Sequence, residues 1–247
     1  MEAELQGAVA LVTGAARNIG RDIVRAFANA GAAVVINAKS SGAAAAELAA
    51  EIESNGGRAM AILADVSDPA DVERLMAETV ARFGGLDILV NNAALRDESP
   101  FAELTLARWR AVMQVVLDGA FLCSQAALPH LRAGGRGAIV NIGGLTAHTG
   151  ARNRAHVITA KAGLVGLTRA LAHDLSNDGI TVNCVVPGLI ATQREGAEPS
   201  HRAARVTLVG RHGAPDDVAS AVRWIAGPGA RYITGQTLHI NGGLYLG

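Results

Sequence analysis

A glycine-rich segment near the N-terminus has the residue types that bind the phosphates of a nucleotide. It reads Thr13-Gly14-Ala15-Ala16-Arg17-Asn18-Ile19-Gly20, directly after an apolar run and directly before a segment of helical period. Glycines let the backbone approach a pyrophosphate, and the free N–H groups at the start of a helix supply donors and a positive dipole. The alternative is an ordinary glycine-rich turn between a strand and a helix, so the motif depends on its context.

Short, β-branched apolar runs alternate along the chain with longer segments of helical period. This alternation predicts an α/β fold, a Rossmann-like, doubly wound parallel sheet of seven strands with helices on both faces. Ser67-Asp68-Pro69 predicts a capped helix start. The predicted strands are 8–13, 32–37, 58–64, 86–91, 137–142, 180–186 and 236–240, and the predicted helices are 19–30, 43–54, 69–83, 106–131, 155–177 and 215–226.

The composition predicts one globular domain. The chain has 247 residues, of which 50% are hydrophobic and 18% charged, so it can build a core and is not disordered. We expect a single dinucleotide-binding domain over residues 1–247, with a short substrate-loop insertion near 193–211. Lys and Arg number 22 and so do Asp and Glu, which argues against a nucleic-acid or anionic-membrane partner.

The cysteines and the N-terminus bear on metal binding and location. Cys123 and Cys184 are far apart and form no CxxC pattern, so we predict neither a disulfide nor a metal site, and expect both in the core. The acidic start, Met1-Glu2-Ala3-Glu4, lacks the basic residues of a signal peptide, and no uninterrupted apolar run approaches the roughly 20 residues of a membrane span. We expect a soluble, cytoplasmic protein.

The motifs together resemble the short-chain dehydrogenase/reductase family over nearly the whole chain. They are the TGxxxxIG spacing, Asp65-Val66 after the third strand, Asn91-Asn92-Ala93-Ala94 after the fourth, Lys161, and Pro187-Gly188 after the sixth. Asn18 stands where the family usually has a glycine, and asparagine tolerates positive φ well. Ala94 replaces a second glycine. Neither departure should abolish binding of a dinucleotide.

The resemblance implies a nicotinamide dinucleotide held along the edge of the sheet. Asp65 and Val66 would frame the adenine, residues 92–94 would line the adenosine and its ribose, residues 187–192 would hold the carboxamide, and Lys161 would bind the nicotinamide ribose. The implied cofactor-binding residues are Gly14, Arg17, Asn18, Ile19, Gly20, Lys39, Ser40, Asp65, Val66, Asn92, Ala93, Ala94, Lys161, Pro187, Gly188, Ile190 and Thr192.

The end of the second predicted strand favours NADP over NAD. An NAD enzyme uses a carboxylate there for the ribose hydroxyls, but this chain has Ala38 at the corresponding position. Lys39 and Arg17 can instead neutralise a 2′-phosphate, with help from the Ser40 hydroxyl. The alternative is that both cations are solvated surface charges, which is a stronger objection for Lys39 than for Arg17.

The family's catalytic side chains are missing. The family uses a tyrosine four residues before its lysine, a serine thirteen residues before that tyrosine, and an asparagine on the preceding long helix. In this chain the three positions hold Val157, Gly144 and Val116. The family mechanism therefore cannot operate unchanged. As a hypothesis, the space above the nicotinamide is roomier and more apolar than in relatives, although the substitutions equally fit decay of an abandoned site.

Lys161 and His156 are the catalytic candidates. Without a phenol at position 157, Lys161 is a ribose ligand first, and an exposed structural lysine is the alternative. Histidine suits acid–base work near neutral pH, but on a helix His156 would point about 100° away from residue 157. A capping or surface histidine is at least as plausible. Thr146, His148, Thr149 and Asn153 also offer polar groups on the loop that lines the family's substrate pocket.

Three functions compete. The first is an NADP-dependent oxidoreductase acting on a small or medium carbonyl or alcohol, with a substituted proton donor. The second is a non-redox enzyme, of hydrolase or lyase type, that uses His156 or loop groups. The third is a catalytically inactive cofactor-binding subunit. Arg194, Arg202 and Arg205 fit either an anionic substrate or a solvated helix face. Relatives imply a homo-oligomer, dimer or tetramer, formed through the two long helices and the last strand.

Overall fold

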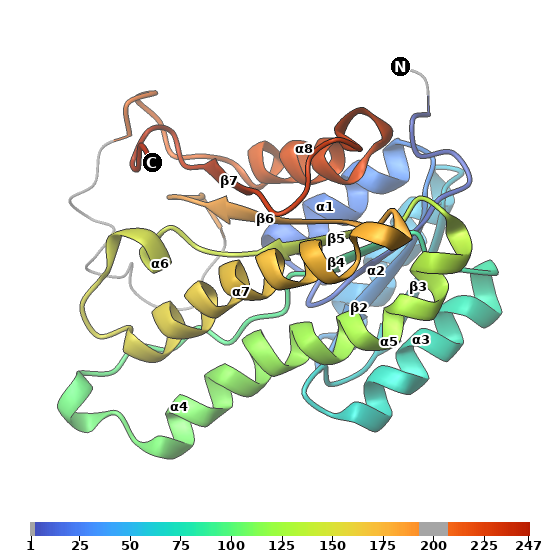
Figure 1. Ribbon diagram of the computed structural model, residues 1–247. Helices are drawn as coiled ribbons and strands as arrows, with labels where there is room; N and C mark the ends of the chain where they lie inside the picture. The colour runs from blue at the N-terminus through green and yellow to red at the C-terminus, as the bar shows by residue number, and fades with distance from the viewer. Residues whose placement is uncertain (1–2, 193–206) are drawn as a thin grey trace.

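A single parallel sheet organises the molecule. The computed structural model describes residues 3–192 and 207–247 (Figure 1). In this part of the chain, seven strands pair in the order β3-β2-β1-β4-β5-β6-β7, and every pair is parallel. The predicted α/β fold is confirmed. The strands are β1 (Val9–Val12), β2 (Ala33–Ala38), β3 (Arg58–Leu63), β4 (Ile88–Asn91), β5 (Ala138–Ile142), β6 (Thr181–Pro187) and β7 (Thr237–Ile240).

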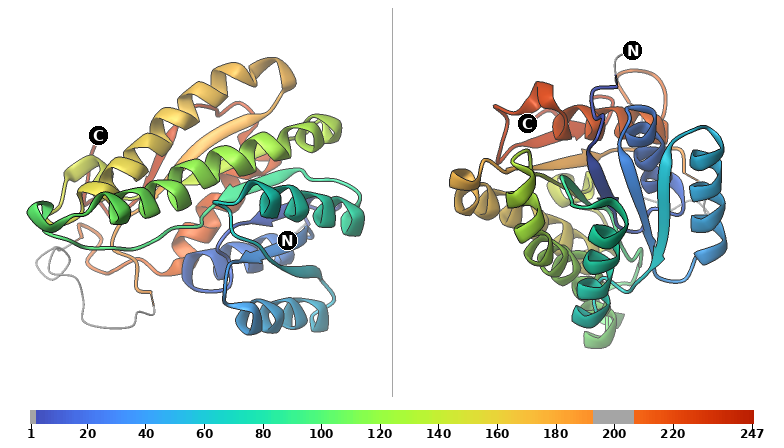
Figure 2. Two further views of the ribbon diagram at one scale, coloured as in Figure 1. Left: turned by 90° about the horizontal axis from the view of Figure 1, so that it is seen from below. Right: turned by 90° about the vertical axis from the view of Figure 1, so that its right-hand side faces the viewer.

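Helices cover both faces of the sheet, as two views at right angles show (Figure 2). Residues of α1, α2 and α8 pack in one core cluster, and residues of α3, α5 and α7 pack in another on the opposite face. The helices are α1 (Asn18–Asn29), α2 (Gly42–Ser54), α3 (Pro69–Phe83), α4 (Leu106–Met113), α5 (Gly119–Gly134), α6 (Thr146–Thr149), α7 (Ala155–Asp174) and α8 (Pro215–Ala226), with 3-10 turns at Phe101–Glu103, Ser176–Asp178 and Pro228–Ala230.

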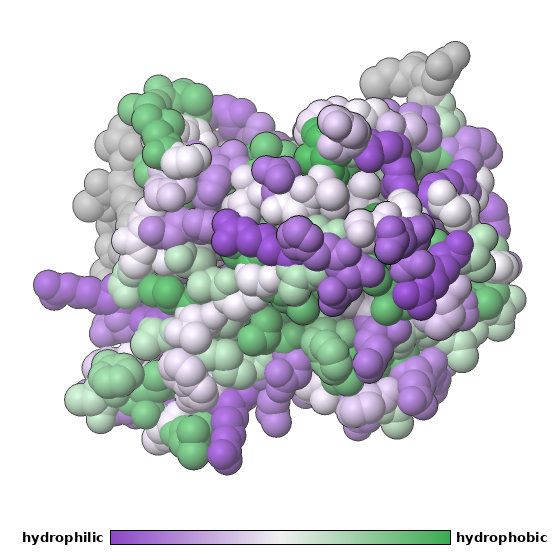
Figure 3. Space-filling model, viewed as in Figure 1, coloured by the Kyte–Doolittle hydropathy of each residue, from purple (hydrophilic) through white to green (hydrophobic). Residues whose placement is uncertain are grey.

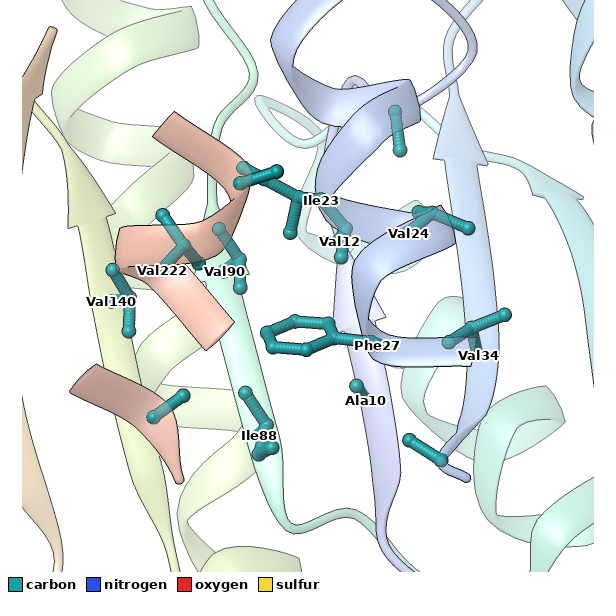
Figure 4. Packing of buried hydrophobic residues seen from close by; sticks show 14 of the residues in the cluster. Ala10, Val12, Ile23, Val24, Phe27, Val34, Ile88, Val90, Val140 and Val222 are labelled. Carbon is teal, nitrogen blue, oxygen red and sulfur yellow. The ribbon is translucent and has the colours of Figure 1, made fainter. Parts of the chain in front are cut away.

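Alternation along the strands builds the two core clusters. Ala10 and Val12 of β1 face α1 and α8, whereas Val9 and Leu11 face the other helix layer. Phe27 of α1 is fully buried among them and fills the space between α1, α8 and the sheet (Figure 4). Because helices cover both faces, the central strands β1, β4 and β5 are fully buried and mostly apolar, whereas the edge strands β3 and β7 are partly exposed.

Local signals in the sequence account for the helix boundaries. The Asp68 carboxylate accepts hydrogen bonds from the N–H groups of Ala70 and Asp71, so α3 begins at Pro69 as predicted. Cys123 and Cys184 are buried and free, as expected. The short helix α6 was not predicted, because its four residues are too few to show a period.

The predicted helix 106–131 runs longer and is less regular than expected. It extends to Gly134 and contains a π-helical turn over Gln114–Asp118 between α4 and α5. By length and composition alone Leu106–Gly134 is apolar enough to cross a membrane, but Val112 and Cys123 on this stretch lie inside the protein core. Core burial accounts for part of its apolar character, since 39% of the most apolar window is buried inside the protein.

Candidate functional site

The glycine-rich turn lies where the strand order reverses. β1 pairs with both β2 and β4, so the chain leaves β1 at the crevice where parallel sheets bind nucleotides. Gly14 has a φ of 59° and Asn18 one of 52°, so both adopt the left-handed conformation, and asparagine replaces the expected glycine as predicted. A Cβ at Gly20 would lie 2.6 Å from Nδ2 of Asn92, so α1 approaches this strand end only through glycine.

Asn92 and Thr13 join the turn to the end of β4. The Asn92 side chain donates from Nδ2 to the carbonyl oxygens of Thr13 and Gly14, both at 2.9 Å. The Thr13 hydroxyl oxygen accepts from the backbone N–H groups of Asn92 and Ala93, each at 3.0 Å. These bonds fix the turn before any ligand binds. Ile19 is half-buried beside it, and Ala94 is exposed.

A charge pair stands at the predicted adenosine end of the site. Nζ of Lys39 lies 2.5 Å from a carboxylate oxygen of Asp65, and the lysine side chain is 67% exposed. The pKa of the Asp65 carboxyl is lowered: burial opposes this shift, while hydrogen bonds from Lys39 and Ser67 produce it. Ser40 is exposed next to Lys39, and Ala38 is buried. Lys39 is thus exposed but paired, rather than freely solvated.

Other predicted cofactor residues have fixed positions in the same edge of the sheet. Arg17 is exposed and stands directly before α1, and Val66 is buried against Gly119. Pro187 ends β6, and a Cβ at Gly188 would lie 2.6 Å from Cα of Asn241. The chain beyond Gly188 is held by a bridge between Ile190 and Gly213, which places Thr192 at the end of an anchored segment.

Lys161 is buried, so the alternative of an exposed lysine is wrong. It is 9% exposed on α7, and its ammonium donates to the carbonyl oxygen of Ile142 at the end of β5. Burial lowers the pKa of this lysine to about 8, and the positive charge of Arg96 acts in the same direction, whereas Cys184 opposes it. A lysine in this state exchanges protons close to neutral pH.

The three positions at which the sequence predicts missing catalytic side chains are apolar or hold a glycine. Val116 and Val157 are 2% and 5% exposed and share one core cluster with Leu164 of α7. A Cβ at Gly144 would have only Cγ of Lys161 within 4 Å, at 3.8 Å. The site is therefore apolar at positions 116 and 157, and its extra room is confined to position 144. Neither valine can donate a proton.

The π-helical turn is centred on this gap. Its five residues include Val116, the position where the sequence predicts the loss of an asparagine. Such turns occur mostly as single insertions in α-helices and are frequent at functional sites. The backbone distortion therefore coincides with one of the three predicted positions.

His156 is neither a surface nor a capping histidine, which corrects both of those alternatives. It is fully buried, and its Nε2 lies 3.0 Å from a carboxylate oxygen of Asp97. Its Nδ1 is buried with no hydrogen-bond partner. Asp97 also accepts two hydrogen bonds from Arg108, at 2.6 and 2.9 Å. The Arg108 guanidinium, against the opposing effect of burial, holds the pKa of the Asp97 carboxyl at about 2, with His156 adding to the effect.

This network was missed from the sequence. Asp97 and Arg96 lie on the loop after β4, which shows no motif, and Arg108 lies on α4. The network pins the loop to the start of α7: Arg108 also donates to the Ser99 hydroxyl, and the Ser99 N–H donates to the Asn153 carbonyl oxygen at 2.8 Å. The only signal in the sequence for such an ion pair is an acidic residue a short distance along the chain from an arginine. This pattern is also common among solvated surface residues, so it does not identify a buried network.

A chain of buried amides lies beneath the site. Asn91 donates from Nδ2 to Asn141 at 2.8 Å and to the Ser124 hydroxyl at 3.1 Å, and Asn141 donates to the Thr168 hydroxyl at 2.9 Å. The relay joins β4, β5, α5 and α7, the elements that carry positions 92, 144 and 161. It fixes their register from inside the fold.

The other polar residues that the sequence offered as substrate-pocket candidates do not share one set of contacts. Thr149 bonds its own helical turn, and His148 packs against His239 and Tyr245. Tyr232 is fully exposed, and Tyr245 packs against the two histidines. Arg194, Arg202 and Arg205, in the predicted loop 193–211, lie outside the described residues.

A parallel sheet with a left-handed, glycine-bearing turn at its crossover and a buried lysine beyond β5 defines a dinucleotide-binding protein of Rossmann type. A family profile described as Enoyl-(Acyl carrier protein) reductase matches residues 14–245. The chain belongs to the short-chain dehydrogenase/reductase family, as the sequence predicted.

Named relatives cover the chain almost entirely. A 3-oxoacyl-[acyl-carrier-protein] reductase of Synechocystis is 37% identical over 243 residues, which are 98% of both chains. One of Vibrio cholerae, named FabG, is 38% identical over 245 residues, 98% of this chain and 99% of the relative. The crystal structure of a Burkholderia cenocepacia short-chain dehydrogenase in complex with NADP superimposes with a TM-score of 0.92 at 39% identity, covering 98% of this chain and 99% of that one.

Proposed function

We propose that the protein is an NADP(H)-dependent oxidoreductase that interconverts a small or medium carbonyl compound and its alcohol, with a proton donor other than the family's tyrosine. The observation that carries this proposal is a contrast within one site. The turn at residues 13–20 keeps its left-handed residues, its contacts with Asn92 and its place at the crossover. Positions 116, 144 and 157 keep none of the polar chemistry.

The charges near β2 support NADP over NAD. Lys39 is exposed at the strand end, Ser40 follows it, and Ala38 supplies no carboxylate. A 2′-phosphate carries a charge that Lys39 and Arg17 are placed to neutralise. The Burkholderia relative, described as a complex with NADP, agrees with this choice. The residues proposed to hold the cofactor are those named from the sequence.

Lys161 is the proposed source of the proton. The bound cofactor would supply hydride, and the developing oxyanion then needs a proton. Among the groups at positions 116, 144, 157 and 161, only the Lys161 ammonium has one, and burial brings its pKa to about 8. Its bond to the Ile142 carbonyl holds Nζ in place. We assign His156 a positioning role, because Asp97 and Arg108 hold it within the loop network.

The loss of tyrosine and serine sets the expected rate. A positioned general acid contributes about 10²–10⁴-fold and an oxyanion donor about 10²–10³-fold. Turnover of an ordinary ketone should therefore fall far below the typical value of about 10 s⁻¹. The turnover of a substrate that carries its own acidic group should fall less, because that group can supply the proton.

The test measures product and nicotinamide absorbance together. NADPH is mixed with a panel that includes 3-oxoacyl thioesters, the substrate class in the relatives' names, and simple ketones and aldehydes. We expect one NADPH consumed per alcohol formed, tighter binding of NADPH than NADH, and loss of that preference in Lys39→Ala but not in Lys39→Arg. Product without absorbance change would exclude the redox proposal, and binding without turnover would favour an inactive cofactor-binding subunit.

A second candidate, a non-redox reaction of lyase or hydrolase type, is favoured by one observation. His156 pairs with a carboxylate and has a second ring nitrogen without a partner, the arrangement of a general base held by an orienting acid. The complete burial of His156 counts against it. If this candidate holds, His156→Gln removes turnover while NADPH binding is unchanged.

We further propose a cytoplasmic homo-oligomer, a dimer or tetramer. Leu208, Val209 and Leu246 are exposed, and an apolar patch covers the region after residue 207 and the C-terminal segment (Figure 3). The edge of β7 and the exposed Phe121 on α5 add two further surfaces that a copy of this chain would cover.

A further inference from the structure

Two histidines outside the cofactor site meet at the far edge of the sheet. His148 lies on α6 and His239 on β7, and their ring centroids are 4.6 Å apart with an interplanar angle of 78°. The ring of Tyr245 contacts both, at 5.5 Å from His148 and 4.8 Å from His239. Three segments distant in sequence thus bring two imidazoles and a phenol together.

Each histidine keeps one ring nitrogen buried without a hydrogen-bond partner. These atoms are Nε2 of His148 and Nδ1 of His239. Buried polar atoms are almost always paired, and an unpaired one in a folded protein often marks a missing water or ion. Within residues 3–192 and 207–247 neither atom has a partner, and both belong to rings that are in direct contact, so a single ligand is the simplest one to consider.

The charge state of the rings suits a cation. Burial lowers the pKa of both histidines, assisted by Arg169 for His148 and by His148 for His239. Burial therefore favours the neutral imidazole on both rings, and each neutral ring has one nitrogen with a lone pair. A protonated pair would repel a cation, whereas two neutral rings can each donate a lone pair to it.

The surrounding backbone holds the two rings in place. The N–H of Leu145, which precedes α6, donates to the carbonyl oxygen of Pro187 on β6. His239 on β7 pairs in register with Val186, the residue before Pro187 on β6. The carbonyl oxygen of Tyr245 accepts from Asn241 at 3.0 Å. His148, His239 and Tyr245 are each partly exposed, so solvent reaches the edge of the cluster although the two nitrogens themselves are buried.

We propose that His148 and His239 bind a borderline transition-metal ion, Zn²⁺ or Cu²⁺, with Tyr245 beside the ion and water completing its coordination. Imidazole is a preferred ligand for both metals, and two nitrogens bind one ion at about 2.0–2.1 Å. No group of three or more His, Cys, Asp or Glu side chains gathers within residues 3–192 and 207–247. With two imidazoles, and with the cation Arg169 nearby, we expect micromolar rather than structural affinity.

The test is a calorimetric titration of the chelator-treated full chain with Zn²⁺ and, separately, Cu²⁺. We expect one equivalent to bind, with affinity falling more than about tenfold in His148→Phe and in His239→Phe, which keep the aromatic packing. His173→Phe, at an exposed histidine on α7, is the matched control and should bind as the wild type does. The Cu²⁺ complex should give an electron paramagnetic resonance spectrum with coupling to two nitrogens.

Two outcomes would overturn the proposal. One is the absence of binding by the wild type at micromolar metal. The other is binding that survives in the folded double variant His148→Phe/His239→Phe, which would place the metal elsewhere. Circular dichroism of each variant establishes that it is folded. The result is independent of the proposed oxidoreductase activity, because no nicotinamide is present in the titration.

Discussion

A buried lysine and a paired carboxylate dominate the candidate site at the level of single residues. Lys161 is desolvated without a neighbouring carboxylate among the groups that shift its pKa, whereas Asp97 is paired with the Arg108 guanidinium and hydrogen-bonded to His156. The two groups therefore affect stability in opposite ways. Lys161 lowers the free energy of unfolding near neutral pH, whereas Asp97 raises it.

Lys161→Met is expected to stabilise the protein near neutral pH. Below pH 8 the lysine is charged in both states, so the folded state carries the desolvation cost. Between pH 8 and 10.5 the unfolded chain binds more protons, so wild-type stability rises with pH and the advantage of the variant fades. After allowance for the lost bond to Ile142, the gain at pH 7 is about 1–2 kcal/mol.

Urea unfolding between pH 7 and 10.5 measures this gain. Lys39→Met is the control, because Lys39, the only other lysine of the chain, is exposed. A Lys161→Met variant that is less stable than the wild type at pH 7 would show that the ammonium is well solvated. The same variant should bind NADPH more weakly, since Lys161 is a proposed ribose ligand.

Asp97→Asn is expected to destabilise the protein by about 1–2 kcal/mol at pH 7, allowing for partial solvent screening of the pair. The folded-state pKa of Asp97 is lowered to about 2 from an ordinary value of 3.8. The wild-type advantage is therefore present above pH 4 and is lost as the pH falls through about 2. Chemical unfolding at pH 7, 4 and 3 should show the two proteins converging. Glu73→Gln, on the exposed face of α3, should show no such pH-dependent difference.

At the level of elements, interior polar contacts fix the register between strands and helices. Asn141→Leu removes the central amide of the relay and leaves Asn91 with only Ser124 as a recorded partner of its Nδ2. We expect a loss of about 2–3 kcal/mol, because polar atoms stay buried without partners. Thermal unfolding checks it, and the exposed Asn177→Leu serves as the control. A loss below that of the control would mean that water or rearranged side chains replace the amide.

The sequence predicted elements better than it predicted contacts. Every strand and every long helix was found to within two or three residues, because apolar runs and caps such as Asp68 are local signals. The turn at 13–20, including positive φ at Asn18, was also predictable, since a left-handed conformation selects few residue types. The Asp97–His156–Arg108 network was not, because it joins a loop and two helices through pairings that no spacing records.

The burial of His156 shows the same limit. Helical geometry predicts that the side chains of His156 and Val157 point in different directions. It does not predict that both are buried, because His156 is enclosed by its contact with Asp97 on the loop after β4. The π-helical turn at Gln114–Asp118 was likewise hidden, because one inserted residue does not change an apolar pattern. Sequence therefore predicted which polar side chains are missing, but it gave no sign of the contacts that surround those positions.

The whole molecule presents apolar surface that one chain leaves uncovered. Light scattering after size-exclusion chromatography is expected to give two or four times the 25.3 kDa of the single chain. Leu208→Glu and Val209→Glu together should shift the mass downward, because charges would be placed on the proposed contact. Glu47→Gln, at an exposed site on α2 and away from the proposed contact surfaces, is the control. A wild-type mass of one chain at micromolar concentration would exclude the oligomer.

The π-helical turn has a consequence for how this scaffold can change. Its central residue, Val116, packs in a buried apolar cluster, and a Cβ at position 144 would have only Cγ of Lys161 within 4 Å. A new side chain at position 144 would therefore need no displacement of the backbone, whereas a polar group at position 116 or 157 would enter the apolar cluster and would need a new hydrogen-bond partner there.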